Sequence, residues 1–297
     1  MIFLDLEKAF DSVPHDPLLL KLERFGINGS LLSCLSNFLL GRYQRVVIEG
    51  YQSDWAPVKS GVPQGSTLVP LLSILYVNDI PEFLSSPADM FADDMLIYNY
   101  CPPSQTSITA QESLDKVTDR CGSWLLRTNA DKCESTKFTK AKTPSSCSYI
   151  INSKLLNQVF THKHLGVVLS EDLFWKPHVL PVVARSNRLL GFLKRTFGSH
   201  SKALFTGYKA MIRPIPEYAC QAWNPHQAHL IEKLECVQRN VTRWIVGKDI
   251  PYEDRLKSLK LPTLVQRREY LSLVQLFKFI KGNSSVNTND YISFSNR

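Results

Sequence analysis

The order of apolar and polar positions predicts a strand and two helices at the start of the chain. Residues 1–6, MIFLDL, form a short and mostly apolar run that is typical of a buried strand. Asp16 and Pro17 predict the start of a helix that Gly26 ends, because aspartate caps and first-turn prolines are common at helix N-termini. A second helix is expected over residues 31–40, because Ser30 and Gly41 bracket it in the same way.

The following part of the chain alternates between hairpins and helices. Residues 45–55 alternate in polarity and turn at Glu49-Gly50, which predicts a hairpin. Residues 90–98, MFADDMLIY, predict a second hairpin with Asp93 and Asp94 at its tip. The other expected elements are the loop SGVPQGS over 60–66, a helix over 67–80 and an amphipathic helix over about 106–127.

The pattern changes after residue 176. Before that point, strands are expected over 134–140 and 148–160, and a tight hairpin over 164–178. After it, the pattern predicts successive helices over 177–197, 200–212, 227–247 and 252–281. We therefore expect an α+β domain over residues 1–176, followed by an all-helical domain with a C-terminal tail over 177–297.

Charge is divided unevenly along the chain. The 297 residues carry a net charge of +8, with a pI of about 9.1. Residues 184–281 hold 18 Lys and Arg against 7 Asp and Glu, a net charge of +11, which leaves −3 for the rest. This asymmetry favours a polyanion bound by the C-terminal half and metal cations bound by the N-terminal half. The alternative interpretation is a solvated basic helical surface.

Composition argues against a membrane-spanning or secreted protein. Apolar runs stay well below the roughly 18 residues that a membrane span needs. The N-terminus lacks the basic flank and long apolar run of a secretory signal. The seven cysteines are odd in number and scattered, which favours a reduced compartment. We expect an intracellular protein, in the nucleus or the cytoplasm, with no membrane partner.

The candidate chemistry begins with carboxylates. Asp93 and Asp94 repel each other, and Asp5 ends the first apolar strand. Asp5 and Asp93 can meet if their strands lie side by side, and such a cluster needs a cation to offset the repulsion. Asp-rich ligation without nearby His or Cys indicates Mg²⁺ instead of zinc. Paired Mg²⁺ ions are an established device for phosphoryl displacement.

Five motifs in a fixed order carry a family resemblance. They are FLDLEKAFDSVPH, SGVPQGSTLVPLLSILYVNDIP, FADD, NADKCE and HLGVVLSEDLFWKPH. In order and spacing they resemble the palm of reverse transcriptases of non-long-terminal-repeat retrotransposons, the jockey-like elements especially. The C-terminal segments from MIRPIPEYACQAWNPH to LPTLVQRRE resemble the thumb of the same group. The resemblance implies a right-hand palm, an antiparallel sheet with packed helices, followed by an all-helical thumb.

The resemblance implies an RNA-directed DNA polymerase, which joins deoxynucleoside triphosphates to a DNA primer on an RNA template. Asp5 and Asp93 would be catalytic and would ligate two Mg²⁺ ions, with Asp94 supporting them. Leu165 and Gly166 match the hairpin that holds the primer end. The oligomeric state cannot be inferred from the sequence.

Four further residues match positions that contact the nucleotide in the family. Phe10 would close the pocket under the sugar 2′ position, although an ordinary core aromatic is the alternative. Gln64 and Gly65 would contact the incoming nucleotide and the template, although a turn before a helix is the alternative. Lys132 would protonate the pyrophosphate leaving group, although a solvent-facing lysine is the commoner explanation.

The chain departs from the family pattern in several places. Val69 and Met95 stand where the family has glycine and threonine, and we expect both beside the site. The fingers region that precedes the first catalytic strand in the family is missing, so the sequence is interpreted as a truncated or degenerate copy.

Two other functions are weighed against this one. A remnant that binds nucleic acid without catalysis would need only the basic helical half. Another palm polymerase, such as a maturase or telomerase, is disfavoured because FADD occurs together with the jockey-like thumb segments.

Overall fold

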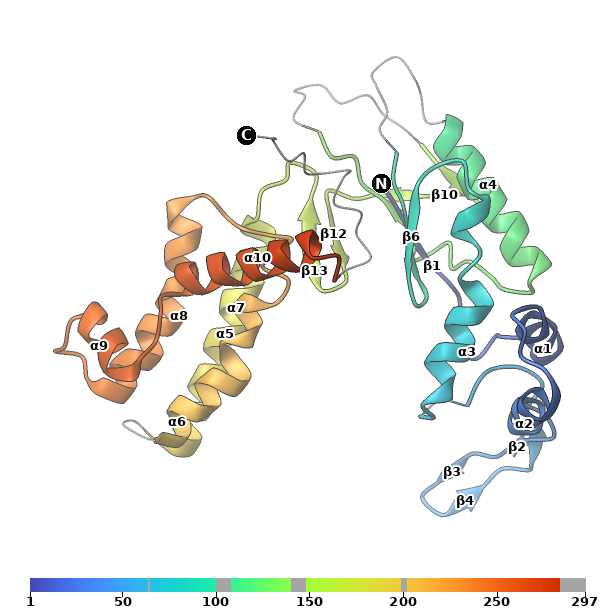
Figure 1. Ribbon diagram of the computed structural model, residues 1–297, viewed down its shortest axis with the longest axis horizontal. Helices are drawn as coiled ribbons and strands as arrows, with labels where there is room; N and C mark the ends of the chain where they lie inside the picture. Colours follow the sequence, from blue (N-terminus) through green and yellow to red (C-terminus); the bar gives the residue numbers. More distant parts are fainter. Residues whose placement is uncertain (64, 100–107, 140–147, 199–201, 284–297) are drawn as a thin grey trace. The chain divides into compact units, whose positions relative to one another are not determined.

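The structure is a computed structural model that describes residues 1–63, 65–99, 108–139, 148–198 and 202–283. It divides into two compact units, Met1–Phe160 and Thr161–Arg297. Figure 1 shows both units and labels many of their helices and strands. Within the described ranges, no helix is both long and apolar enough to cross a membrane.

A five-stranded sheet, ordered β11-β8-β1-β7-β6, forms the centre of the first unit. β1 lies in the middle, antiparallel to both of its neighbours, and its residues Ile2 to Leu4 are buried. β11 is parallel to β8 at one edge. The strands are β1 (Ile2–Asp5), β6 (Ala88–Phe91), β7 (Asp94–Ile97), β8 (Glu134–Ser135) and β11 (Asn157–Gln158).

One hydrophobic core joins this sheet to the helices around it. The core holds Ile2 and Leu4 of β1, together with apolar residues of all four α-helices of the unit. The helical segments are α1 (His15–Arg24), α2 (Gly29–Leu39), α3 (Leu68–Val77), the 3₁₀ turn η1 (Pro81–Phe83) and α4 (Ile108–Ser123). Short paired strands complete the unit: β2 (Tyr43–Gln44) with β5 (Ala56–Pro57), β3 (Val47–Ile48) with β4 (Tyr51–Gln52), and β9 (Ile150–Ile151) with β10 (Lys154–Leu155).

The predicted elements of the first unit are present, with small differences. The turn at Glu49-Gly50 is confirmed, because both residues have positive φ between β3 and β4. The predicted cap at Asp16 is wrong: α1 begins at His15, with Pro14 as its N-cap. Asp16 lies in the first turn, where its negative charge complements the positive end of the helix dipole.

A buried ion cluster connects α1, α3 and α4. Lys21 is 5% exposed, and its Nζ donates to Oδ1 of Asp79 at 2.5 Å and to the carbonyl of Tyr76 at 2.6 Å. Arg120 donates to the other carboxylate oxygen of Asp79 at 2.8 Å. Burial acts to raise the pKa of Asp79, but the hydrogen bonds and charges of Lys21 and Arg120 outweigh it and hold the pKa below its usual value. Asp79 is therefore ionised at neutral pH and neutralises Lys21.

The glycine-proline loop is attached to the segment after β1. The backbone N–H of Gly61 donates to the carbonyl of Val13 at 2.8 Å, and the Gly61 carbonyl lies 2.9 Å from Nε2 of buried His15. Gly61 has φ +90°, and a Cβ placed there would lie 2.8 Å from the carbonyl oxygen of Asp11. Only glycine allows this close approach, so Gly61 sets the position of the loop.

The second unit combines a hairpin with helices. β12 (Thr161–His164) and β13 (Val167–Ser170) pair through a two-residue turn. α6 continues directly into one π-helical segment, η2. The helices are α5 (Lys176–Phe197), α6 (Lys202–Gly207), η2 (Tyr208–Ile212), α7 (Pro214–Glu217), α8 (Ala228–Val246), α9 (Tyr252–Leu259) and α10 (Leu264–Ile280).

The hairpin belongs to the helical unit, so the compact units divide at 160/161 and not at the expected 176/177. Val167 of β13 shares a buried cluster with Val179 of α5 and Trp223. The backbone N–H of Val168 donates to Nδ1 of His178 at 3.2 Å. Burial lowers the pKa of His178 to about 4, so its ring is neutral at pH 7 and can accept this hydrogen bond.

The single helix expected over 252–281 is wrong, because two helices occupy this segment. α9 ends at Leu259, and the next residue, Lys260, has a left-handed φ of +52°. Thr263 then begins α10 through a capping box with Gln266. The sequence T-L-V-Q after Pro262 matches the capping-box pattern and marks this break.

The buried ion cluster yields the first test. Asp79→Asn leaves the Lys21 ammonium buried without its counter-ion, so we expect a loss of about 2–4 kcal/mol in the free energy of unfolding at pH 7, measured with urea. Because the folded pKa of Asp79 is depressed, its stabilisation is present above the unfolded pKa and is lost as the pH falls through the folded value. The difference between the two proteins should therefore shrink in acid. Asp131→Asn removes an exposed partner of Lys154 and serves as the control, with an expected change below about 1 kcal/mol.

The glycine-proline loop yields the second test. Gly61→Ala adds a methyl group against the backbone of Asp11, which cannot move without displacing the loop. Gly26→Ala is a matched control, because Gly26 has φ +85° with nothing within 4 Å of its Cβ position. Both variants bear the cost of a left-handed alanine, about 1–2 kcal/mol. We expect Gly61→Ala to lose at least about 1 kcal/mol more in urea unfolding, and equal losses would contradict the contact.

Candidate active site

The central strand and the second hairpin hold two aspartates opposite each other. In the antiparallel pairing of β1 with β7, Asp5 is the cross-strand partner of Asp94. Asp93 comes immediately before Asp94, in the turn between β6 and β7. The strand that follows Asp93 lies beside β1, as expected, although the residue directly opposite Asp5 is Asp94. Cross-strand partners have Cβ atoms roughly 4.5–5.5 Å apart, so the charges of Asp5 and Asp94 are held close together.

Strand alternation places these aspartates on the face of the sheet away from the core. Leu4 belongs to the core, and Asp5 follows it on the opposite face. Met95 follows Asp94 and is 1% exposed in the same core. Val69 of α3 is buried there too. Val69 and Met95, which we expect beside the site, both have their side chains in the core.

The turn that bears Asp93 is as short as a hairpin turn can be. Phe91 pairs with Asp94, so only Ala92 and Asp93 connect the strands. Ala92 has φ +55°, a conformation that two-residue hairpin turns demand and that costs an alanine about 1–2 kcal/mol. The tight turn leaves Asp93 no freedom to move along the strand.

Lys132 is brought to Asp5 by the segment that follows α4. Leu6 and Thr128 form an isolated bridge, and the backbone N–H of Asn129 donates to the Asp5 carbonyl at 2.8 Å. The N–H of Lys132 donates to the Asn129 carbonyl at 3.0 Å, which turns the chain back toward β1. Nζ of Lys132 then lies 3.4 Å from Oδ2 of Asp5. The lysine that the resemblance singles out is in direct contact with the first candidate carboxylate.

The other nucleotide-contacting candidates belong to the segment after β1 and to the glycine-proline loop. Phe10 is half-buried and packs against the core, and its carbonyl accepts a hydrogen bond from the N–H of Val62 at 2.8 Å. That bond joins the segment after β1 to the glycine-proline loop. Gly65 is exposed, with φ +91°. Gln64 lies outside the described residues.

Sequence reasoning missed His15 and Gly61, the residues that position the loop. The sequence does indicate a special role for Gly61, because a glycine just ahead of Val-Pro in a turn often has positive φ. Nothing in the local sequence indicates the role of His15, because its hydrogen-bond partner lies 46 residues further along the chain.

The hairpin proposed to hold the primer is stabilised by a tyrosine. Leu165 and Gly166 both have positive φ, as a two-residue hairpin turn requires. The hydroxyl of Tyr218 donates to the carbonyl of Leu165 at 2.9 Å. A Cβ at Gly166 would lie 3.1 Å from the Tyr218 ring, so the ring packs directly on the turn. Tyr218 is a second residue whose role no sequence motif indicated.

The carboxylates have the chemistry of a magnesium site but do not form a closed one. Asp5, Asp93 and Asp94 offer only oxygen, the ligand that Mg²⁺ prefers. Within the part of the chain that the structure describes, no three His, Cys, Asp or Glu side chains converge closely enough to hold a metal ion. The donor type therefore fits a divalent metal. In this structure the carboxylate of Asp5 contacts the ammonium of Lys132.

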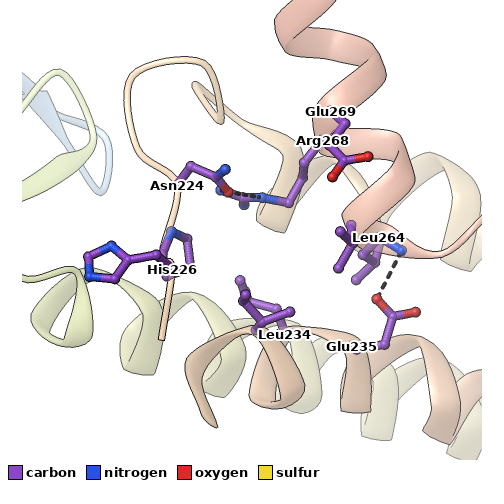
Figure 2. A pocket seen from close by; sticks show the side chains of 10 residues that line it. Asn224, His226, Leu234, Glu235, Leu264, Arg268 and Glu269 are labelled. Carbon is purple, nitrogen blue, oxygen red and sulfur yellow. Dashed lines mark hydrogen bonds between the residues drawn. The ribbon is translucent and has the colours of Figure 1, made fainter. Parts of the chain in front are cut away.

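A cavity of about 210 Å³ lies in the second unit, between the loop at Asn224, α8 and the start of α10 (Figure 2). Its buried charged groups are bonded within the protein. Glu235 accepts a hydrogen bond from the N–H of Leu264 at 2.9 Å, and Arg268 donates to the carbonyl of Trp223 at 2.6 Å. Arg268 also donates to the side chain of Asn224 at 3.2 Å. We therefore assign these charges to the packing of α10 on α8.

Two kinds of comparison place the chain among known proteins. The family described as reverse transcriptase (RNA-dependent DNA polymerase) matches residues 1–178. The RNA-directed DNA polymerase from the mobile element jockey of Drosophila melanogaster is 28% identical over 88% of this chain and 30% of the relative. The probable RNA-directed DNA polymerase from transposon X-element of the same species is 29% identical over 83% of this chain and 28% of the relative.

The chain thus spans less than a third of the length of these curated relatives. A solved structure of telomerase from Candida albicans covers 87% of this chain and 39% of its own, with a TM-score of 0.42 at 14% identity, which is too weak to carry an argument. The family match covers more than half of the chain and agrees with the resemblance that the five motifs indicate. The chain belongs to the reverse transcriptase (RNA-dependent DNA polymerase) family, with relatives among non-long-terminal-repeat elements such as jockey.

Proposed function

We propose that this chain carries the catalytic part of an RNA-directed DNA polymerase. The reaction is attack of a DNA primer 3′-oxygen on the α-phosphate of a deoxynucleoside triphosphate, with pyrophosphate as the leaving group and RNA as the template. The observation that carries the proposal is the register that sets Asp5 across from Asp94, within a chain that matches the family over residues 1–178.

In this proposal Asp5 and Asp93 hold two Mg²⁺ ions, and Asp94 adds negative charge beside them. When bound, the metals would activate the attacking oxygen and neutralise charge on the leaving group. The protein's own contribution is to fix Asp5 on β1 and Asp93 in the turn that leads into the neighbouring strand β7. β1 and the two-residue turn leave them little freedom, so they need little reorganisation to act together.

The remaining site residues would position the substrates. Phe10 would exclude a ribose 2′-hydroxyl, and the backbone of the loop at Gly65 would approach the nucleotide closely. Gln64 has this role from the resemblance alone. Lys132 would donate a proton to the pyrophosphate. The turn at Leu165-Gly166 would hold the primer end.

We further propose that the first unit is the palm and the second the thumb. The second unit contains the strongly basic part of the sequence, residues 184–281, with a net charge of +11. Basic side chains bind the phosphates of template and primer without sequence preference and with strong salt dependence. This charge also favours a second candidate function, binding of nucleic acid without catalysis.

Primer extension on an RNA template tests the proposal with this chain alone. We expect Mg²⁺-dependent extension, reduced on the order of 100-fold or more by Asp5→Asn and by Asp93→Asn, because each removes a metal ligand. Glu23→Gln, which removes an exposed negative charge of α1, should leave the rate unchanged.

Binding of the primer–template should stay within about threefold of wild type in both variants, measured by fluorescence anisotropy, because the basic unit is intact. Tight binding with no extension by the wild type would favour the second candidate function. Extension that persists in Asp93→Asn would show that the site is assigned wrongly.

A further inference from the structure

The ammonium of Lys132 lies beside a group of aspartates whose negative charges repel one another. Its Nζ lies 3.4 Å from Oδ2 of Asp5, the residue whose cross-strand partner is Asp94. Asp93 adds a third carboxylate in the adjoining turn. These carboxylates do not converge into a metal-binding group within the described part of the chain. The ammonium of Lys132, in contact with Asp5, offsets part of their mutual repulsion.

We propose that Lys132 is the exchangeable counter-ion of the metal-free site. When a divalent cation binds Asp5, Lys132 leaves that carboxylate and becomes available to the pyrophosphate end of the nucleotide. The inference rests on the proposed function, because it assumes that Asp5 is a metal ligand. The inference adds a coupling between two steps, because binding of the divalent cation to Asp5 also releases Lys132 from that carboxylate.

The geometry makes this exchange easy. The side chain of Lys132 is 68% exposed and that of Asp5 only 23%, so the lysine can swing into solvent while the carboxylate stays in place. Exposed ion pairs are weak, whereas a divalent cation carries twice the charge and repels a neighbouring ammonium. Lys21 is the contrasting case, because it is buried against Asp79 and has no solvent to move into.

The backbone keeps the released lysine near the site. The N–H groups of Lys132 and Cys133 both donate to the carbonyl of Asn129, at 3.0 and 3.1 Å. The N–H of Asn129 donates in turn to the carbonyl of Asp5. The Cα of Lys132 is therefore tied to β1 whichever anion its side chain contacts, so a change of partner needs only rotation about side-chain bonds.

The first test is the affinity for divalent metal, measured by calorimetry with Mg²⁺ and by electron paramagnetic resonance with Mn²⁺. Lys132→Met keeps the aliphatic side chain but removes the competing charge, so we expect roughly three- to tenfold tighter metal binding. The gain should shrink at high salt, which screens exposed charges. Lys132→Arg retains a cation and should bind metal about as wild type does.

Lys8→Met is the matched control for a general loss of positive charge. Lys8 lies three residues after Asp5 and takes part in none of the ion pairs found among the described residues. Its substitution should change the metal affinity by less than about twofold.

The second test is binding of inorganic pyrophosphate in the presence of saturating Mg²⁺. If Lys132 moves to this anion, Lys132→Met should weaken pyrophosphate binding about tenfold while strengthening metal binding. Opposite effects on the two ligands are not expected of a residue that only stabilises the fold.

The outcomes separate this inference from the proposed function. Unchanged metal affinity in Lys132→Met, or an equal gain in Lys8→Met, would overturn the exchange while leaving Asp5 as a ligand. Metal binding that is absent, or that is unaffected by Asp5→Asn, would overturn the metal site itself and the inference with it.

Discussion

The register between β1 and β7 is the constraint on which the site depends. Ile2 and Leu4 face the core, and burial of an aliphatic side chain contributes about 1.5–3 kcal/mol. Two carboxylates about 5 Å apart repel by only about 1 kcal/mol in water. Core burial therefore wins over electrostatic repulsion and forces Asp5 to face Asp94. The site is a set of charges held together by the apolar side chains on the other face of the same strands.

The ion pairs of Asp79 and Asp5, both in the first unit, differ in how far they are buried. Asp79 is permanently neutralised by Lys21 and Arg120, which bind α1 and α4 to the end of α3. Asp5 instead meets a lysine that remains largely in solvent. Burial decides the difference, because a buried pair cannot lose one member without a large desolvation cost, whereas an exposed pair exchanges with water or ions at little cost.

Much of this arrangement could be predicted from local sequence. The hairpin with Asp93 at its tip, the first strand and most helices follow from periodicity and turn residues, whereas the family follows from the resemblance of five ordered motifs. Contacts between distant segments could not be predicted, because no local pattern encodes the partner of His15 or the Tyr218 hydroxyl on Leu165. The compact units divide at 160/161 instead of 176/177 because Val167 of β13 packs on α5 and on the distant Trp223. The division of 252–281 into two helices was available in the capping box at Thr263.

The two-residue turn between Phe91 and Asp94 has a consequence for how this hairpin can change in length. Side chains of a strand point alternately to its two faces, so one residue inserted within β7 with the pairing otherwise kept would invert the positions that follow it. If the insertion preceded Asp94, Met95 would then point away from the core and Asp94 into the apolar interior. An odd number of inserted residues therefore has to be absorbed by a longer turn or a β-bulge, whereas an even number within the strand keeps the facing of the carboxylates.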